Sequence, residues 1–326
     1  MGGALDPSAV GARHRHLVQL HLAALLFGGI GLFGKLVDLS PGALVLARSG
    51  IAAAFVLAVA LIVGQGIGLR RRSDLAVFAV LGVILAVHWV AFFRSIQVST
   101  VSIAVLTVAT FPVFTTLLKA AVERRRPGRL DVLLALAALG GVALIVGNPD
   151  VGRADTQGVL WGVAASALFA VVTIVNERLV LGYAGHTVAL YQYGIAALLL
   201  APFFAADLGE VSGSSWIVLA VFGTVFTGVP HTLFISSMRV IPSPTASLAV
   251  SMEPVYGVAL AWLVLAEAPG LRVLAGGAVV LIAVAIGSRA GAKHPSPAVL
   301  SDAGQSTTKV TARPRYPRPP SPTRIE

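Results

Sequence analysis

The chain has 326 residues, of which 56% are hydrophobic and only 12% are charged. A soluble domain carries about 25% charged residues and about 45–50% apolar ones, so a soluble enzyme is excluded. The sequence has no cysteine, which excludes disulfides, thiolate chemistry and cysteine-ligated metals. Lys and Arg exceed Asp and Glu by 24 to 14, which gives a net charge of +10. These charges lie between apolar segments and do not form the patch that a nucleic acid would need, so no nucleic-acid partner is expected.

Ten apolar segments follow one another, each long enough for a helix that crosses a hydrocarbon core about 30 Å thick. Their apolar residues run all round each segment, as in helices surrounded by lipid and by other helices. The sequence therefore predicts an all-α polytopic membrane protein with ten transmembrane helices. The predicted spans lie near residues 17–37, 43–63, 75–93, 101–122, 131–147, 158–175, 187–206, 216–237, 245–264 and 271–288.

The basic residues of the short loops predict the orientation, because such residues stay on the cytoplasmic side. Alternate loops, beginning with the loop between spans 2 and 3, hold nine arginines, whereas the opposite loops hold three. Both termini are therefore expected in the cytoplasm, in a multi-pass protein of the cytoplasmic (inner) membrane. The nine are Arg70, Arg71, Arg72, Arg124, Arg125, Arg126, Arg129, Arg178 and Arg239.

The two halves of the chain resemble each other at an offset of about 143 residues. Pro112-Val113 matches Pro254-Val255, and Gly50-Ile51-Ala52-Ala53 recurs from Gly194. Five spans in each half, an odd number, place the halves in opposite directions, as in secondary transporters built from inverted repeats. The expected units are a cytoplasmic N-terminal segment (1–16), two five-helix repeats (17–147 and 158–288), and a disordered, basic, Pro-rich cytoplasmic tail (291–326).

These features resemble the EamA family of the drug/metabolite transporter superfamily. The resemblance covers most of residues 17–288 and rests on the ten spans, the duplication, Arg48 in the second span and Glu253-Pro254-Val255 in the ninth. It implies an inner-membrane exporter of small metabolites, with a cavity between spans 1–4 and 6–9. Spans 5 and 10 would then serve packing or contact with a second copy in a homodimer. One departure is that Phe111 stands at the position that matches Glu253.

Glu253 is the acidic residue that the predicted spans place deep in the membrane. An ionised carboxylate there costs at least a few kcal/mol, so it should face a cavity, meet a cation or hold a proton. The alternative is a structural role, in which Glu253 binds backbone groups freed where Pro254 interrupts the helix. Its expected role is substrate binding or proton coupling.

His88 and His231 also lie within spans and are 143 residues apart, which is close to the repeat offset. Histidine can carry a proton near neutral pH and can donate or accept hydrogen bonds, so both are candidates for substrate contact or a proton relay. The alternative for each is a neutral ring bonded to a neighbouring helix.

Arg48, Gln192 and Trp89 are further candidates for contact with a substrate. Arg48 could bind a carboxylate or phosphate in a fork, or its side chain could reach the outer interface or an ion-pair partner, which is the interpretation we favour from sequence. Gln192 stands at the matching place in span 7 and could orient a ligand or bond to another helix. Trp89 could wall a cavity or simply pack.

Pro112 and Pro254 form a matched pair that is expected to kink spans 4 and 9. Paired bends of this kind suit a central site, although a static kink that improves packing is the alternative.

The sequence predicts a secondary transporter that moves a small metabolite, such as an amino acid or a related compound, by alternating access. Its partners are the substrate and the lipid bilayer, and proton coupling is open. A second reading is a membrane-embedded ligand sensor or assembly partner that moves nothing. Phosphate loops and metal-ligand motifs are missing from the sequence, so neither enzymatic activity nor a cofactor nor a metal is expected. The substrate and the direction of transport are not encoded in any motif.

Overall fold

The computed structural model describes residues 7–147 and 153–291. Most of the expected C-terminal tail, residues 292–326, and the first six residues of the chain lie outside the described residues. Within them all regular structure is helical, which confirms the all-α prediction. In chain order the helices are α1 (Pro7–Gly28), α2 (Ile30–Leu36), α3 (Pro41–Ile62), α4 (Asp74–Val98), α5 (Val101–Val108), α6 (Phe111–Val122), α7 (Arg129–Val146), α8 (Ala154–Leu179), α9 (Gly185–Phe204), the 3₁₀ helix η1 (Ala206–Glu210), α10 (Gly213–Gly223), the π-helix η2 (Thr224–Gly228), α11 (Val229–Ser237), α12 (Ser243–Val250), α13 (Glu253–Leu265) and α14 (Leu271–Gly291).

Eight helical stretches of the described chain are long and apolar enough to cross a membrane. Two shorter apolar helices, Glu253–Leu265 and Leu271–Gly287, follow them. The helices overlap the ranges that the sequence predicts for its spans, although α1 begins at Pro7, ten residues before the first predicted span. The ninth predicted span corresponds to two short helices, α12 and α13, because the chain is interrupted between them.

Many large apolar side chains are exposed on the surface of the bundle. Leu263 is 79% exposed and Leu198 is 75% exposed, and large aliphatic side chains are exposed on most of the long helices. A monomeric soluble protein rarely shows so much contiguous apolar surface. The outer faces of these helices are therefore suited to lipid, as hydrophobic spans of this length require.

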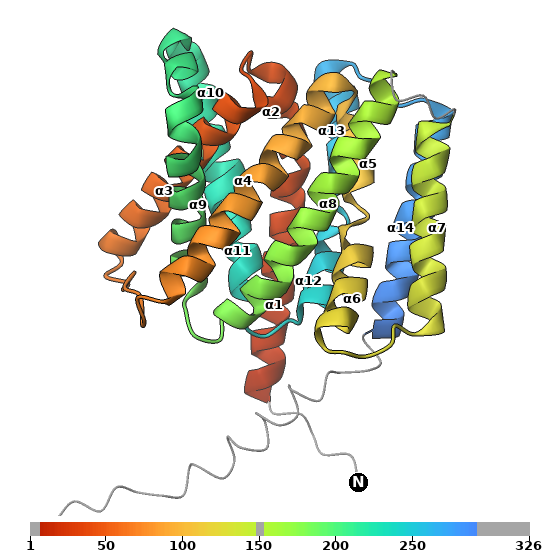
Figure 1. Ribbon diagram of the computed structural model, residues 1–326, viewed down its shortest axis with the longest axis horizontal. Helices are drawn as coiled ribbons and strands as arrows, with labels where there is room; N and C mark the ends of the chain where they lie inside the picture. The colour runs from red at the N-terminus through yellow and green to blue at the C-terminus, as the bar shows by residue number, and fades with distance from the viewer. Residues whose placement is uncertain (1–6, 148–152, 292–326) are drawn as a thin grey trace, which may run out of the picture.

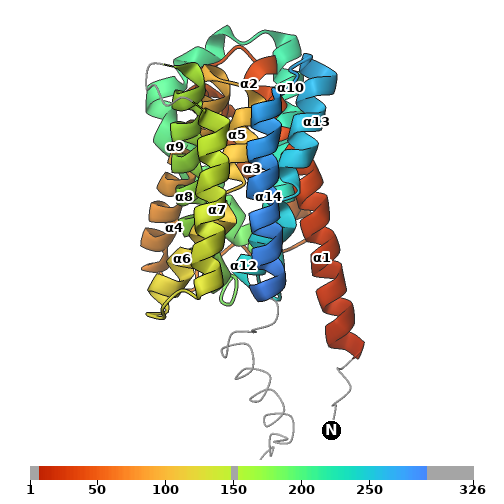
Figure 2. The ribbon, with the colours of Figure 1, turned by 90° about the vertical axis from the view of Figure 1, so that its right-hand side faces the viewer.

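The helices stand side by side in one bundle, with the start of α1 and the end of α14 at the same end, which we call the terminal end (Figure 1). Helices α4 and α8 pack against each other on the face of the bundle that is turned to the viewer in Figure 1, and α7 and α14 pack against each other at one edge (Figures 1 and 2). At the opposite edge α3 packs on α9 and α10.

Two helices of the bundle are broken at corresponding places in the two halves. Residues 109–110 separate α5 from α6, and residues 251–252 separate α12 from α13. Pro112 and Pro254 are the second residues of α6 and α13. Proline has no N–H to donate, and the first turn of a helix is the place where that donor has no partner within the helix. Each half thus contains a helix that restarts in the middle of the bundle.

Close contact between α7 and α14 depends on facing glycines. A Cβ atom added at Gly141 would lie 2.7 Å from the carbonyl oxygen of Gly276, a backbone atom that cannot turn away. The neighbouring Gly140 faces open space, with no described atom within 4 Å of an added Cβ. The two glycines are neighbours in α7, but only Gly141 packs against α14.

We expect Gly141→Ala to lower the stability of the protein in detergent by about 1–3 kcal/mol, because the helices must separate to admit the methyl group. Gly140→Ala is the matched control and should raise stability by about 0.5–1 kcal/mol, since alanine loses less backbone entropy than glycine in a helix. The midpoints of thermal unfolding measure both effects. Shifts of the same sign would contradict the packing described here.

Candidate functional site

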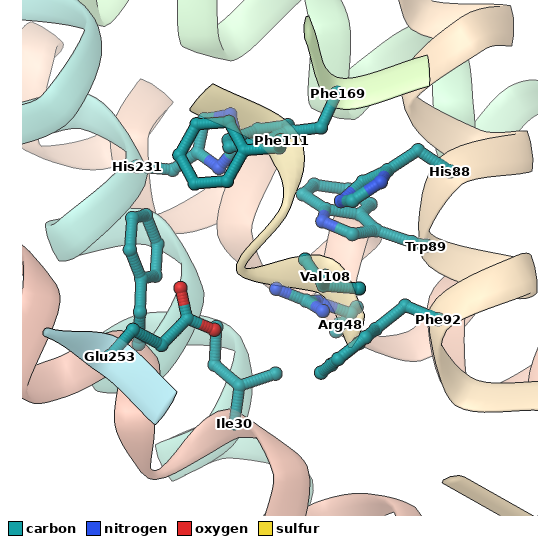
Figure 3. Close-up of a pocket in the computed structure, with 11 residues that line it drawn as sticks. Ile30, Arg48, His88, Trp89, Phe92, Val108, Phe111, Phe169, His231 and Glu253 are labelled. Carbon is teal, nitrogen blue, oxygen red and sulfur yellow. The ribbon is translucent and has the colours of Figure 1, made fainter. Parts of the chain in front are cut away.

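A cavity lies in the middle of the bundle, between helices of the two halves (Figure 3). The space among the lining atoms, counted together with the solvent that is open to it, is about 420 Å³. The first half contributes residues of α1 to α6, and the second half contributes residues of α8, α11 and α13. The lining residues are Phe27, Ile30, Arg48, His88, Trp89, Phe92, Val108, Phe111, Phe169, His231 and Glu253.

Arg48 of α3 is the cation of the cavity, and its side chain is fully buried. Its Nε donates a hydrogen bond to Oγ1 of Thr227, 3.2 Å away. The guanidinium carbon lies 4.2 Å from the ring centre of Trp89, 4.7 Å from that of Phe222 and 5.4 Å from that of Phe93, so aromatic rings stabilise the cation. The two terminal nitrogens have no hydrogen-bond partner among the described residues. The expectation that Arg48 reaches the outer interface is therefore wrong, because the aromatic rings and Thr227 retain its head inside the bundle.

Glu253 is the carboxylate of the cavity and the first residue of α13. It is half-buried, and its carboxyl group points across the cavity toward the guanidinium of Arg48 (Figure 3). None of the ion pairs found in the described ranges joins the two groups. A carboxylate in the first turn of a helix is favoured by the helix dipole, so the broken helix gives Glu253 both its place and part of its electrostatic support.

His88 of α4 joins the two halves of the bundle. Its Nδ1 donates to the carbonyl oxygen of Ala165 in α8 at 2.8 Å, since a carbonyl can only accept. Its ring also stacks on Phe169, with ring centres 4.8 Å apart and planes 19° apart. These two contacts fix the orientation of the ring, and therefore also the position of Nε2. His88 thus packs against α8 and also lines the cavity.

His231 of α11 lies in a box of aromatic rings. The ring centres of Trp89, Phe169 and Phe27 are 5.6, 5.8 and 5.9 Å from that of His231. Its Nε2 is buried and meets no hydrogen-bond partner in the described part of the chain. This nitrogen and the two terminal nitrogens of Arg48 are buried polar atoms of the cavity lining that have no hydrogen-bond partner among the described residues.

Gln192 does not line the cavity, unlike the other candidates from sequence. It is fully buried, and its Nε2 donates to Oδ1 of Asn176 at 2.5 Å, which ties α9 to α8. Trp89 does line the cavity, with its ring against the guanidinium of Arg48. Pro112 and Pro254 follow the cavity residues Phe111 and Glu253 directly.

Two features of the site carry no signal that sequence reasoning used. Thr227 holds Arg48 from η2, and its Oγ1 donates in turn to the carbonyl of Phe222 at 2.9 Å. A π-turn within an apolar span has no characteristic residues that would reveal it in the sequence, although such turns are frequent at functional sites.

Clusters of three or more His, Cys, Asp or Glu that could hold a metal ion do not occur in residues 7–147 and 153–291.

A second polar cluster lies at the terminal end of the bundle. Nζ of Lys119, near the end of α6, is 2.7 Å from each carboxylate oxygen of Glu177, near the end of α8. The hydroxyl group of Ser243, the first residue of α12, donates to the same carboxylate at 2.6 Å. The cluster therefore joins the first half, through α6, to the second half, through α8 and α12.

Comparison with known proteins places the chain in a family. The sequence model of the EamA-like transporter family matches residues 16–147 and again residues 156–289. An uncharacterised transporter of Bacillus subtilis, YxxF, is 25% identical over 75% of this chain and 80% of its own length. The uncharacterised inner membrane transporter YicL of Salmonella typhimurium is 26% identical over 78% of this chain and 89% of its own.

A third relative has a named substrate. The threonine/homoserine exporter RhtA of Escherichia coli is 29% identical over 60% of this chain and 65% of its own length. Among solved structures, one crystal structure aligns with a TM-score of 0.62 at 19% identity, over 87% of this chain and 99% of the other, which shows a shared fold. Two matches to one family, covering most of the sequence, show that this chain is a multi-pass membrane protein and belongs to the EamA-like transporter family.

Proposed function

We propose that the protein is a secondary transporter that carries a small metabolite through the central cavity by alternating access. The ten spans would form two inverted five-helix repeats, residues 17–147 and 158–288, that rock against each other. Exchange of conformation between two related halves exposes a midplane site to either side in turn. The observation that carries the proposal is the cavity itself, because both halves line it and because it holds one cation and one carboxylate that do not pair.

The terminal end of the bundle is proposed to face the cytoplasm, as the nine arginines of the alternate loops indicate. Helices α7 and α14 contribute no side chain to the cavity lining, so we assign them to packing and to contact with a second copy. The inner membrane is the proposed location, in line with the name of one relative.

The proposed substrate is an amino acid or a related compound, and the proposed direction is export. The cavity offers a positive group at Arg48 and a negative one at Glu253, with aromatic walls between them. A zwitterion presents the complementary pair of charges. The name of RhtA, which refers to threonine and homoserine, supports the same class of substrate.

Glu253 is the proposed coupling residue, with His231 and His88 as its supports in the wall of the cavity. A carboxylate that binds a proton in one state and the ammonium group of a substrate in the other exchanges one cation for the other. Entry of a proton could then drive exit of the amino acid. The scheme needs neither nucleotide nor metal.

The test is transport by the purified full chain in liposomes that contain a pH-sensitive dye. The twenty common L-amino acids and L-homoserine are added one at a time, with labelled threonine as a second readout. We expect at least one compound to cross the membrane in exchange for protons, and protein-free liposomes are the control. If no compound crosses faster than in that control, the proposed function is wrong.

A further inference from the structure

The strongest unexplained feature of the cavity is the head of Arg48. Its side chain is fully buried, yet only Nε has a hydrogen-bond partner, and both terminal nitrogens lack one in the described chain. An arginine remains charged in proteins, and a buried charge without a counterion is strongly destabilising. The guanidinium of Arg48 therefore lies at the wall of the cavity as a cation, and its two terminal nitrogens donate no hydrogen bond to a described residue.

The surroundings of Arg48 fix the direction of these two nitrogens. Thr227 accepts a hydrogen bond from Nε, and the ring centres of Trp89 and Phe222 lie 4.2 and 4.7 Å from the guanidinium carbon. Thr227 is itself fixed, because its hydroxyl donates to the carbonyl of Phe222 and its own carbonyl accepts from Tyr193 at 3.3 Å. The rotation of the head is thus restricted, which lowers the entropy that a ligand would have to overcome.

Other groups around the cavity add positive potential of the same kind. Phe111 and Glu253 are the first residues of α6 and α13, and both line the cavity. The beginnings of these two helices are therefore directed at it, and helix N-termini favour anions. The charged and titratable groups that face Arg48 in the cavity lining are Glu253, His88 and His231.

We propose that Arg48 is the subsite for a carboxylate group of the transported substrate, with Thr227, Trp89 and Phe222 as positioning residues. The two terminal nitrogens bind the two carboxylate oxygens in a parallel pair of hydrogen bonds. A phosphate group fits less well, because it carries close to two negative charges and would face Glu253 with one arginine to balance it. The inference rests on the proposed function and extends it, because it names the carboxylate as the group of the substrate that Arg48 recognises.

The test compares acids with their amides on the purified full chain in detergent, by titration calorimetry. All twenty L-amino acids are screened first. The tightest binder and L-threonine are then compared with their own amides and with inorganic phosphate. We expect each acid to bind about 10–100-fold more tightly than its amide, as the loss of a charge-assisted pair implies. Phosphate should not compete at equal concentration.

The variant arm separates binding from folding. Arg48→Met should abolish binding of the acid, yet the unfolding midpoint of the empty protein should equal or exceed that of the wild type, since a buried unpaired charge is removed. Thr227→Val should weaken the acid about 3–10-fold and leave the amide unchanged. Arg94→Gln, which removes an exposed arginine from α4, is the matched control and should bind as the wild type does.

Two results would overturn the assignment without reference to any variant: amides that bind as tightly as their acids, or no binding by any of the twenty acids. A third would be unchanged binding by Arg48→Met. Failure of the proposed function looks different. If the acid binds to the wild type and not to Arg48→Met, but no compound crosses the liposome membrane, the carboxylate subsite is supported and the proposed transport is wrong.

Discussion

Glu253→Gln is expected to reduce proton-driven transport to the leak of protein-free liposomes, a loss of about 100-fold or more in a tightly coupled carrier. Glutamine has nearly the same shape and cannot bind and release a proton, nor can it balance an ammonium group. The variant should fold, because it removes a charge from the cavity and loses only the dipole contribution at the start of α13, about 0.3–1 kcal/mol. The measurement is amino-acid flux in liposomes with an imposed pH gradient.

A matched control is Glu123→Gln, which neutralises a carboxylate of the exposed ion pair with Arg125 outside the cavity. It should transport as the wild type does. Threonine-for-threonine exchange adds a second readout for Glu253→Gln. Retained exchange with lost proton coupling would restrict Glu253 to the proton, whereas full gradient-driven transport by the variant would remove it from the mechanism.

The sequence predicts the architecture well because membrane spans follow from hydropathy alone. Lipid offers no hydrogen bonds, so each apolar segment must satisfy its own backbone as a helix. The same reasoning located the acid, the two histidines, Arg48 and Trp89, all of which line one cavity. Polar residues are rare within the apolar spans, so they can be recognised in the sequence without knowing which residues surround them in the fold.

What sequence reasoning missed depends on neighbours distant in the chain. The depth of Arg48 in its span permits a position at the interface, but Thr227, 179 residues away, holds the side chain inside the bundle. For Gln192 the sequence allows either a ligand contact or a bond to another helix, and the structure shows the second, to Asn176. Glu177 lies two residues beyond the end of the predicted span 6 at residue 175, so hydropathy does not mark it as a residue within the membrane. Contacts across helices explain the first two cases and a boundary of a predicted span explains the third, and hydropathy carries no information about such contacts.

In the transport cycle that we propose, the cluster of Lys119, Glu177 and Ser243 would close the terminal end of the bundle. It joins α6 of the first half to α8 and α12 of the second, and alternating access requires such contacts to break when that end opens. The side chains of Lys119 and Glu177 are 13% and 21% exposed, so the pair is shielded from water but not isolated from it. Ion pairs in that position contribute more than those at a surface.

Breaking this cluster should therefore shift the protein toward the state that is open at the terminal end, which we propose faces the cytoplasm. The chain has no cysteine, so Ser247→Cys gives a single thiol. Ser247 is buried on α12, one turn beyond Ser243, and its hydroxyl has no hydrogen-bond partner among the described residues, so the probe itself removes no contact of that kind.

In the Ser247→Cys background, Lys119→Met should raise the rate of labelling by a membrane-impermeant maleimide about tenfold. A shift of about 1.4 kcal/mol in the equilibrium between the closed and open states is sufficient for this. Exchange of the two charges, Lys119→Glu with Glu177→Lys, should restore slow labelling, because the pair re-forms in the opposite sense. Glu123→Gln, which breaks an exposed pair, should leave the rate unchanged. Equal labelling rates in all four proteins would show that the cluster supports the fold without controlling access, since a lock between the two halves must change exposure when it is broken.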